Sequence, residues 1–193
     1  MILKDKLLKS VAKSPEMNEE ELEIVAYGME ILFQKTFFFI GAIIISLAMR
    51  SLIQGIVFMV LFSILRQNAG GVHMNTKISC AASSAALFIA SLVLINLAVK
   101  YSEAYFVLLC LSGAGMVILL LLAPVDTPNK RIPKNQKKKI SLKVKIIILG
   151  FYVIFFISSL LEFKLLCSAI IVTVIIESIL VVVGKILLNS LNI

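Results

Sequence analysis

The sequence predicts an all-α, polytopic membrane protein with about six transmembrane helices and an amphipathic helical region at the N-terminus. The apolar fraction of 60% and the mean hydropathy of +1.04 exceed the values typical of soluble domains. The apolar residues are gathered in runs that approach the length needed to cross a bilayer. The net charge is +8, and the excess of basic residues is concentrated in Lys130–Lys145. Such a cluster is typical of a cytoplasmic loop next to a membrane.

Residues 1–30 contain no apolar run long enough to span a bilayer. In their first part, the apolar residues Leu3, Leu7, Leu8 and Val11 recur at helical spacing, with lysines between them. This pattern is typical of a helix that lies on the membrane surface. Ser14-Pro15 interrupts the pattern, and Pro15 is suited to begin a second helix. We therefore expect residues 1–30 to form amphipathic membrane-surface helices and residues 31–193 to form one membrane-embedded domain.

The predicted membrane domain consists of six apolar runs. They are Ile31–Met49, Leu52–Leu65, Ile78–Val99, Tyr105–Ala123, Ile146–Leu161 and Leu165–Val183. The second and fifth runs are short for a bilayer, so we expect the bilayer to thin there or the helices to extend at their ends. The first run reaches full length only if the Lys35 side chain extends to the membrane surface.

The sequence allows two readings around Arg50, because residues 36–65 could form two spans or one. A single long helix would place Arg50 near the middle of the membrane, at a cost of about 2.5–3.5 kcal/mol on insertion scales. Two helices joined by a tight turn would keep the arginine at the membrane surface. We favour the turn.

The charge pattern also predicts an orientation. If Lys130–Lys145 is cytoplasmic, then both termini and Arg66–Lys77 are cytoplasmic as well, and the short, nearly neutral loops lie outside. The same basic segment is suited to contact anionic lipid. Nucleic acid is not an expected partner, because no aromatic residues or binding motif accompany the lysines.

The stretch from Arg66 to Cys80 is a polar segment between two apolar runs, and it contains residue types that can act in catalysis. It contains His73, the only histidine of the chain, and Cys80, a cysteine close to a predicted membrane boundary. A cysteine thiolate is a strong nucleophile, and histidine is suited to accept its proton near neutral pH. On one straight helix these two side chains would be roughly 10 Å apart. We therefore expect a bend at Gly70-Gly71, with Thr76 or Ser79 capping a helix that carries Cys80 in its first turn.

The other cysteines indicate no further chemistry. Cys80, Cys110 and Cys167 are odd in number and scattered, which predicts neither a disulfide framework nor a metal site, and no cofactor is expected. Cys110 and Cys167 lie in apolar runs and are interpreted as small buried side chains. Glu177 also lies inside an apolar run, where a carboxylate is usually functional or paired. The sequence alone names no partner for it.

Two segments resemble the accessory gene regulator B family of membrane peptidases. The first holds Arg66, Gly70-Gly71, His73 and Cys80, and the second is Ala123-Pro124-Val125-Asp126, which leads into the basic segment. The resemblance implies that residues 31–193 form a cysteine endopeptidase domain. It assigns Cys80 as the nucleophile and His73 as the general base and acid. Arg66, Gly70 and Gly71 become supporting positions.

The resemblance also implies a substrate and a product. Family members cut the acidic C-terminal tail from a small amphipathic precursor peptide through a thioester acyl-enzyme. The retained part then closes to a thiolactone or lactone, which serves as a quorum-sensing pheromone. The resemblance implies that Asp126, Lys130 and Arg131 bind substrate. It also implies a homodimer in the bacterial cell membrane, with the active site on the cytoplasmic side.

Two other classes of function remain open from the residues alone. A small peptide transporter would be expected to show internal repeats and broken helices, and no repeat is evident. A non-catalytic membrane adaptor would recruit an acidic partner through Lys130–Lys145, and replacing Cys80 by serine would then have no effect.

Overall fold

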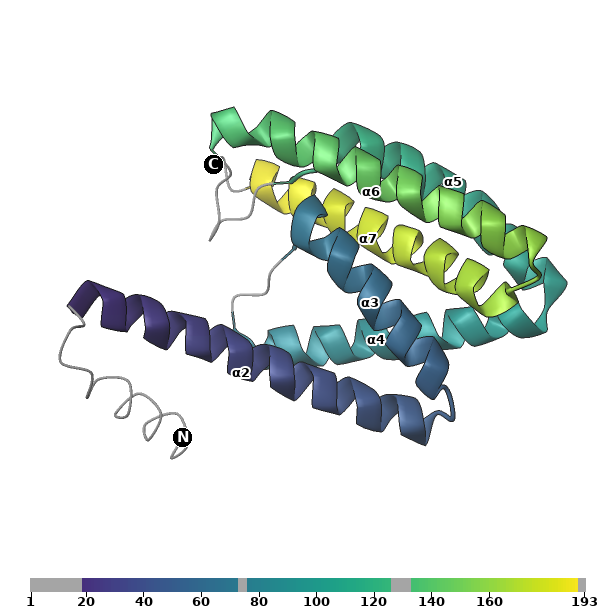
Figure 1. The fold of residues 1–193 in the computed structure, drawn as a ribbon, viewed down its shortest axis with the longest axis horizontal. Helices are drawn as coiled ribbons and strands as arrows, with labels where there is room; N and C mark the ends of the chain where they lie inside the picture. Colours follow the sequence, from purple (N-terminus) through teal and green to yellow (C-terminus); the bar gives the residue numbers. More distant parts are fainter. Residues whose placement is uncertain (1–18, 73–75, 126–132, 191–193) are drawn as a thin grey trace. The chain divides into compact units, whose positions relative to one another are not determined.

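The computed structural model describes residues 19–72, 76–125 and 133–190, and these form an all-α fold (Figure 1). The described helices are α2 (Glu19–Ala48), α3 (Leu52–Ala69), α4 (Lys77–Lys100), α5 (Ser102–Leu122), α6 (Lys134–Leu160) and α7 (Lys164–Ser190). No β-strand occurs in the described part of the chain, which confirms the predicted fold class. The amphipathic helix predicted near the N-terminus falls on residues 1–18, which lie outside the described residues.

Among the described residues, five helices are long and apolar enough to cross a membrane, so the chain is a multi-pass membrane protein. They are α3, α4, α5, α6 and α7. The first predicted span, Ile31–Met49, corresponds to the apolar part of α2, Leu32–Ala48, which is shorter than the others. This part follows the more polar first half of α2 without a break in the helix.

The tight turn expected at Arg50 is confirmed. Helix α2 ends at Ala48 and α3 begins at Leu52. Arg50 has a φ of 52°, the left-handed conformation that reverses a chain within few residues. The Ser51 N–H donates to the Ser46 carbonyl at 2.8 Å, and Asn96 of α4 donates to the Ser51 hydroxyl at 2.8 Å. These bonds satisfy polar groups where the two helices meet.

The chain divides into two compact units, Met1–Ala42 and Ile43–Ile193, and the border lies within α2. The boundary predicted between residues 30 and 31 also falls inside this continuous helix. The second unit contains α3 to α7 and all described residues of the candidate site. The fold and the site are therefore described within this unit.

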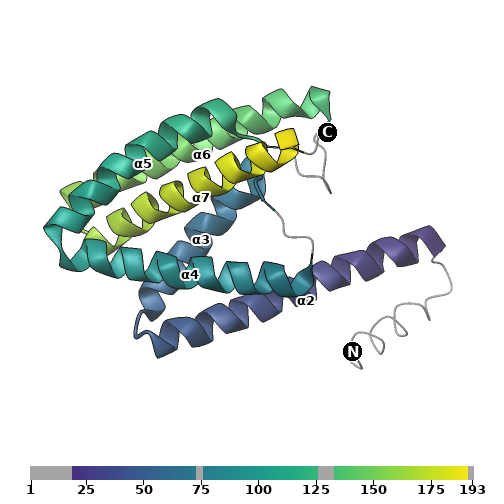
Figure 2. The same cartoon turned by 180° about the vertical axis from the view of Figure 1, so that it is seen from behind.

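Helix α7 is the central element of the second unit. It contacts α3, α4, α5 and α6, and it runs beside α5 and α6 in both views (Figures 1 and 2). In α7, 72% of the apolar segment is buried, against 17–33% in the other four spanning helices. A helix that is apolar on all sides is expected in such a position, because it can bury every face.

Small residues bring α7 close to α5. A Cβ atom added at Gly115 of α5 would meet the Ser178 hydroxyl of α7 at 3.0 Å. Close approach through glycine and serine is typical of packed membrane helices, because it strengthens van der Waals contact between backbones.

Helix α6 begins at Lys134, well before the predicted start at Ile146. The sequence predicts a cytoplasmic loop here because basic residues are concentrated in this segment. Lysine is nevertheless a good helix former, so the run can extend the apolar helix out of the membrane. Its exposed side chains include Lys137, Lys138, Lys139, Lys143 and Lys145. The predicted basic loop is therefore helical from Lys134 onward.

Candidate functional site

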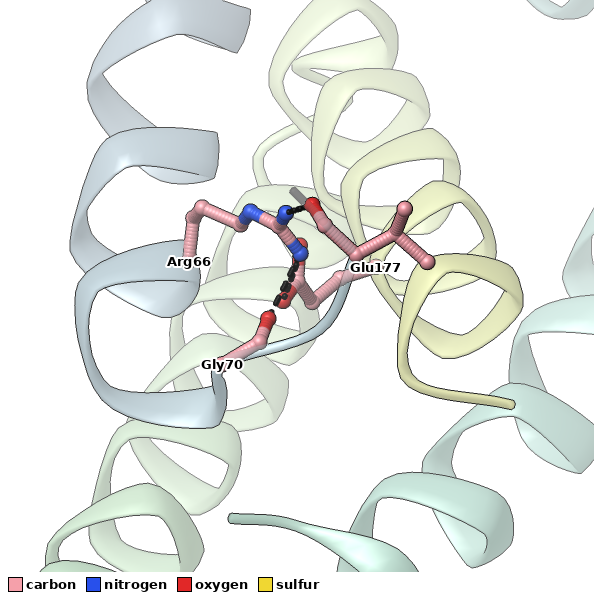
Figure 3. Close-up of polar contacts among 4 residues, drawn as sticks. Arg66, Gly70 and Glu177 are labelled. Atoms are coloured by element: carbon pink, nitrogen blue, oxygen red, sulfur yellow. Dashed lines mark hydrogen bonds and ion pairs between the residues drawn. The ribbon is translucent and has the colours of Figure 1, made fainter. Parts of the chain in front are cut away.

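The candidate site is organised by Arg66, in the last turn of α3 (Figure 3). Its guanidinium donates from Nη1 to the Gly70 carbonyl at 2.6 Å and from Nη2 to the Val72 carbonyl. Both acceptors lie in the segment that follows α3 and precedes His73. The planar guanidinium has several donors in a fixed arrangement, so one side chain can hold two carbonyl groups together.

Gly70 and Gly71 form the bend that Arg66 holds. Their φ angles are +79° and +116°, which glycine adopts without the steric cost of a Cβ atom. A Cβ at Gly70 would collide with the Val125 carbonyl oxygen, and one at Gly71 would collide with Arg66 Nη1. Glycine is therefore required at both positions for conformation and for space. Their supporting role in catalysis remains a prediction.

The second sequence segment that carries the family resemblance meets the first at this bend. The Val125 N–H donates to the Ala69 carbonyl at 3.0 Å, and Gly70 and Val125 form an isolated parallel β-bridge. Ala123 and Val125 are buried. The ends of α3 and α5 are thus tied together, which places the two segments at the same end of the helix bundle. The charge pattern likewise assigns both segments to one side of the membrane.

Glu177 of α7 completes the contacts of Arg66. Its carboxylate is fully buried, and Oε1 lies 3.5 Å from Arg66 Nη1 (Figure 3). This ion pair joins residues 111 positions apart in the chain. Sequence reasoning singled out Glu177 inside an apolar run and Arg66 at the start of a polar stretch, but it did not pair them. The available signal was the position of Glu177, because an intramembrane charge needs a partner.

Cys80 lies in the first turn of α4, as predicted. Thr76 is the cap of this helix, and its hydroxyl accepts a hydrogen bond from the Ser79 N–H at 3.2 Å. The Cys80 N–H donates to the Thr76 carbonyl at 3.0 Å. The thiol-bearing residue is half-buried, whereas Cys167 is buried in α7 and Cys110 is exposed on α5. Cys80 therefore combines partial accessibility with a helix N-terminus.

The remaining predicted site residues lie outside the described part of the chain. They are His73, Asp126, Lys130 and Arg131. The distance between His73 and Cys80 thus stays a prediction, as do the substrate contacts of the other three. Among the described residues, no group of three or more histidine, cysteine, aspartate or glutamate side chains could hold a metal ion.

The family profile named accessory gene regulator B matches residues 4–181, which include Arg66, Cys80 and Glu177. The chain belongs to the accessory gene regulator B family. This match extends over both segments that carried the resemblance and over most of α7. No solved structure matches the chain.

Curated relatives agree with the family profile. An AgrB-like protein of Clostridium perfringens (strain SM101 / Type A) is 28% identical over 194 residues, covering 93% of this chain and 91% of the relative. AgrB-like protein 2 of Clostridium perfringens (strain 13 / Type A) is 27% identical over 150 residues, covering 76% and 70%. Accessory gene regulator protein B of Staphylococcus epidermidis is 29% identical over 119 residues, covering 62% and 52%.

Proposed function

We propose that the chain is a membrane cysteine endopeptidase that removes the C-terminal tail of a small precursor peptide and promotes cyclisation of the remainder. The observation that carries this proposal is the position of Cys80 in the first turn of a capped helix, where it is half-buried. A helix N-terminus favours negative charge, which suits a thiolate nucleophile. Family membership supports the same assignment.

In the first step, His73 accepts the proton of the Cys80 thiol, and the thiolate attacks the carbonyl carbon of the scissile peptide bond. The tetrahedral intermediate collapses as the carbon–nitrogen bond breaks. His73 returns the proton to the leaving amine, which departs with the acidic tail. The retained N-terminal part is then held on Cys80 as a thioester.

In the second step, a thiol or hydroxyl group within the retained peptide attacks the thioester carbonyl. His73 accepts the proton of this group, and the Cys80 thiolate leaves as the ring closes. Ring closure is favoured over hydrolysis because the attacking group belongs to the same bound molecule. Exclusion of water at the membrane boundary favours the same outcome.

The proposed substrate is amphipathic and ends in an acidic tail, and its cyclic product acts in quorum sensing. Exposed lysines in the first turns of α6 support recognition of such a tail by charge. Asp126, Lys130 and Arg131 are proposed to contribute to the same surface. A homodimer in a bacterial cell membrane, with the active site and both termini on the cytoplasmic side, completes the proposal.

The peptidase assignment is tested by measuring release of the C-terminal tail from a precursor peptide that is encoded in the same genome as this chain. The protein in lipid vesicles should release the tail, and Cys80→Ala should abolish this release because the nucleophile is lost. The double variant Cys110→Ala/Cys167→Ala is the matched control and should retain activity. Tail release that persists in Cys80→Ala would contradict the proposal. Bound precursor without cleavage by the folded wild-type protein would instead favour an adaptor.

A further inference from the structure

We propose that Glu177 is a positioning residue for this reaction, acting through Arg66 to hold the Gly70–Val72 segment against α7. The described chain reaches the proposed general base His73 through this segment. The expected effect on catalysis rests on the proposed function. The contacts that hold the Gly70–Val72 segment against α7 are observed among described residues and do not depend on it.

The first observation is the direction of the Arg66 hydrogen bonds. The guanidinium bonds to the Gly70 and Val72 carbonyls while Nη1 faces Glu177 Oε1 at 3.5 Å (Figure 3). The bend and α7 are therefore connected through one rigid group. A neutral residue at position 177 would leave the guanidinium without its anionic partner on α7, and the bend would lose this connection.

The second observation is a close backbone contact on the same helix. A Cβ added at Gly184 of α7 would lie 3.0 Å from both Cα and C of Gly71 and 3.2 Å from the Val72 nitrogen. The bend thus packs directly on the α7 backbone, further along the helix from Glu177. Two separate contacts, one by charge and one by close packing, place the same segment on α7.

The burial of Glu177 supports a role for its carboxylate in this contact. The side chain is fully buried, and its Oε2 atom has no hydrogen-bond partner among the described residues. A buried carboxylate with a single ion-pair contact is not a favourable way to stabilise a helix bundle. An apolar residue would pack α7 equally well, so the contact with Arg66 is what requires the charge.

The test compares Glu177→Gln with Ser178→Ala, a change at the neighbouring buried position that faces α5 instead of the bend. Glu177→Gln should slow formation of the Cys80 thioester at saturating precursor by about 10- to 100-fold, because small misplacements of catalytic groups have effects of this size. The half-saturating precursor concentration should not change. Glu177→Asp, which keeps the charge, should restore part of the rate, and Ser178→Ala should behave as wild type.

A second variant reaches the bend without altering charge. Gly184→Ala should displace the Gly70–Val72 segment and slow thioester formation in the same way. Gly113→Ala is its matched control, because a Cβ there meets no atom within 4 Å. In both Glu177→Gln and Gly184→Ala, the backbone amides of Gly70–Val72 should exchange their hydrogens with solvent faster than in the wild type.

The outcomes separate this proposal from the proposed function. Unchanged amide exchange and unchanged thioester formation in Glu177→Gln, while the wild type forms the thioester, would overturn the positioning role alone. Absence of the thioester in the wild type would overturn the peptidase assignment. In that case, faster amide exchange in Glu177→Gln would still establish the connection between the bend and α7.

Discussion

At the scale of single residues, the site depends on side chains that each satisfy several constraints. Arg66 holds two carbonyl groups of the bend and one carboxylate of α7. Gly70 and Gly71 leave room for Val125 and Arg66 and adopt positive φ angles. Because each residue has more than one partner, a substitution at any of them is expected to disturb both stability and activity.

Stability and activity can nevertheless be separated at the ion pair. Arg66→Met should lower the free energy of unfolding by about 3–5 kcal/mol, because it leaves the buried Glu177 carboxylate without its cationic partner. The double variant Arg66→Met/Glu177→Leu removes both charges and should recover most of that loss. Unfolding titrations in mixed micelles measure both variants. Recovery of stability without recovery of tail release is the expected result, and a double variant as unstable as Arg66→Met would contradict it.

Some of these residues could be predicted from the sequence and others could not. Gly70-Gly71 and the Thr76 cap are local features, so the bend and the first turn of α4 followed from neighbouring residues. The pairing of Arg66 with Glu177 joins residues 111 positions apart, and such a contact is decided by helix packing. The close approach of Gly184 to Gly71 depends on the same packing and was not predicted.

At the scale of secondary-structure elements, hydropathy located most helices but not all of their ends. Helices α3, α4 and α5 begin and end within a few residues of the predicted apolar runs. Helix α6 begins earlier because lysines extend it, and α2 begins at Glu19 because its polar half continues the apolar helix. Hydropathy reports burial in lipid, whereas helix ends also depend on intrinsic propensity and capping.

The cap of α4 provides a prediction at this scale. Thr76→Ala should lower the free energy of unfolding by about 1 kcal/mol, because the Ser79 N–H loses its side-chain acceptor. Thr76→Ser keeps a hydroxyl acceptor and should resemble the wild type. Equal stability of the alanine and serine variants would show that the cap contributes nothing.

At the scale of the whole helix bundle, α7 supports the site from the centre. It contacts the four other spanning helices of the second unit, and it carries Glu177 and Gly184 beneath the bend. Helix α7 therefore has a second role besides filling the core. The predicted spans followed from the pattern of apolar runs, and five of the six match helices long enough to cross a membrane. The central position of α7 depends instead on how the helices pack together.

The central claim is that Cys80 forms a covalent thioester with the precursor peptide. Intact-mass measurement of the protein in lipid, after incubation with the precursor, tests it most directly. We expect a mass gain equal to the precursor without its tail. This gain should be absent in Cys80→Ala and should form about 10²–10⁴-fold more slowly in His73→Ala, the range expected for loss of a general base. A folded wild-type protein that binds the precursor but shows neither adduct nor released tail would show that Cys80 does not act as the nucleophile.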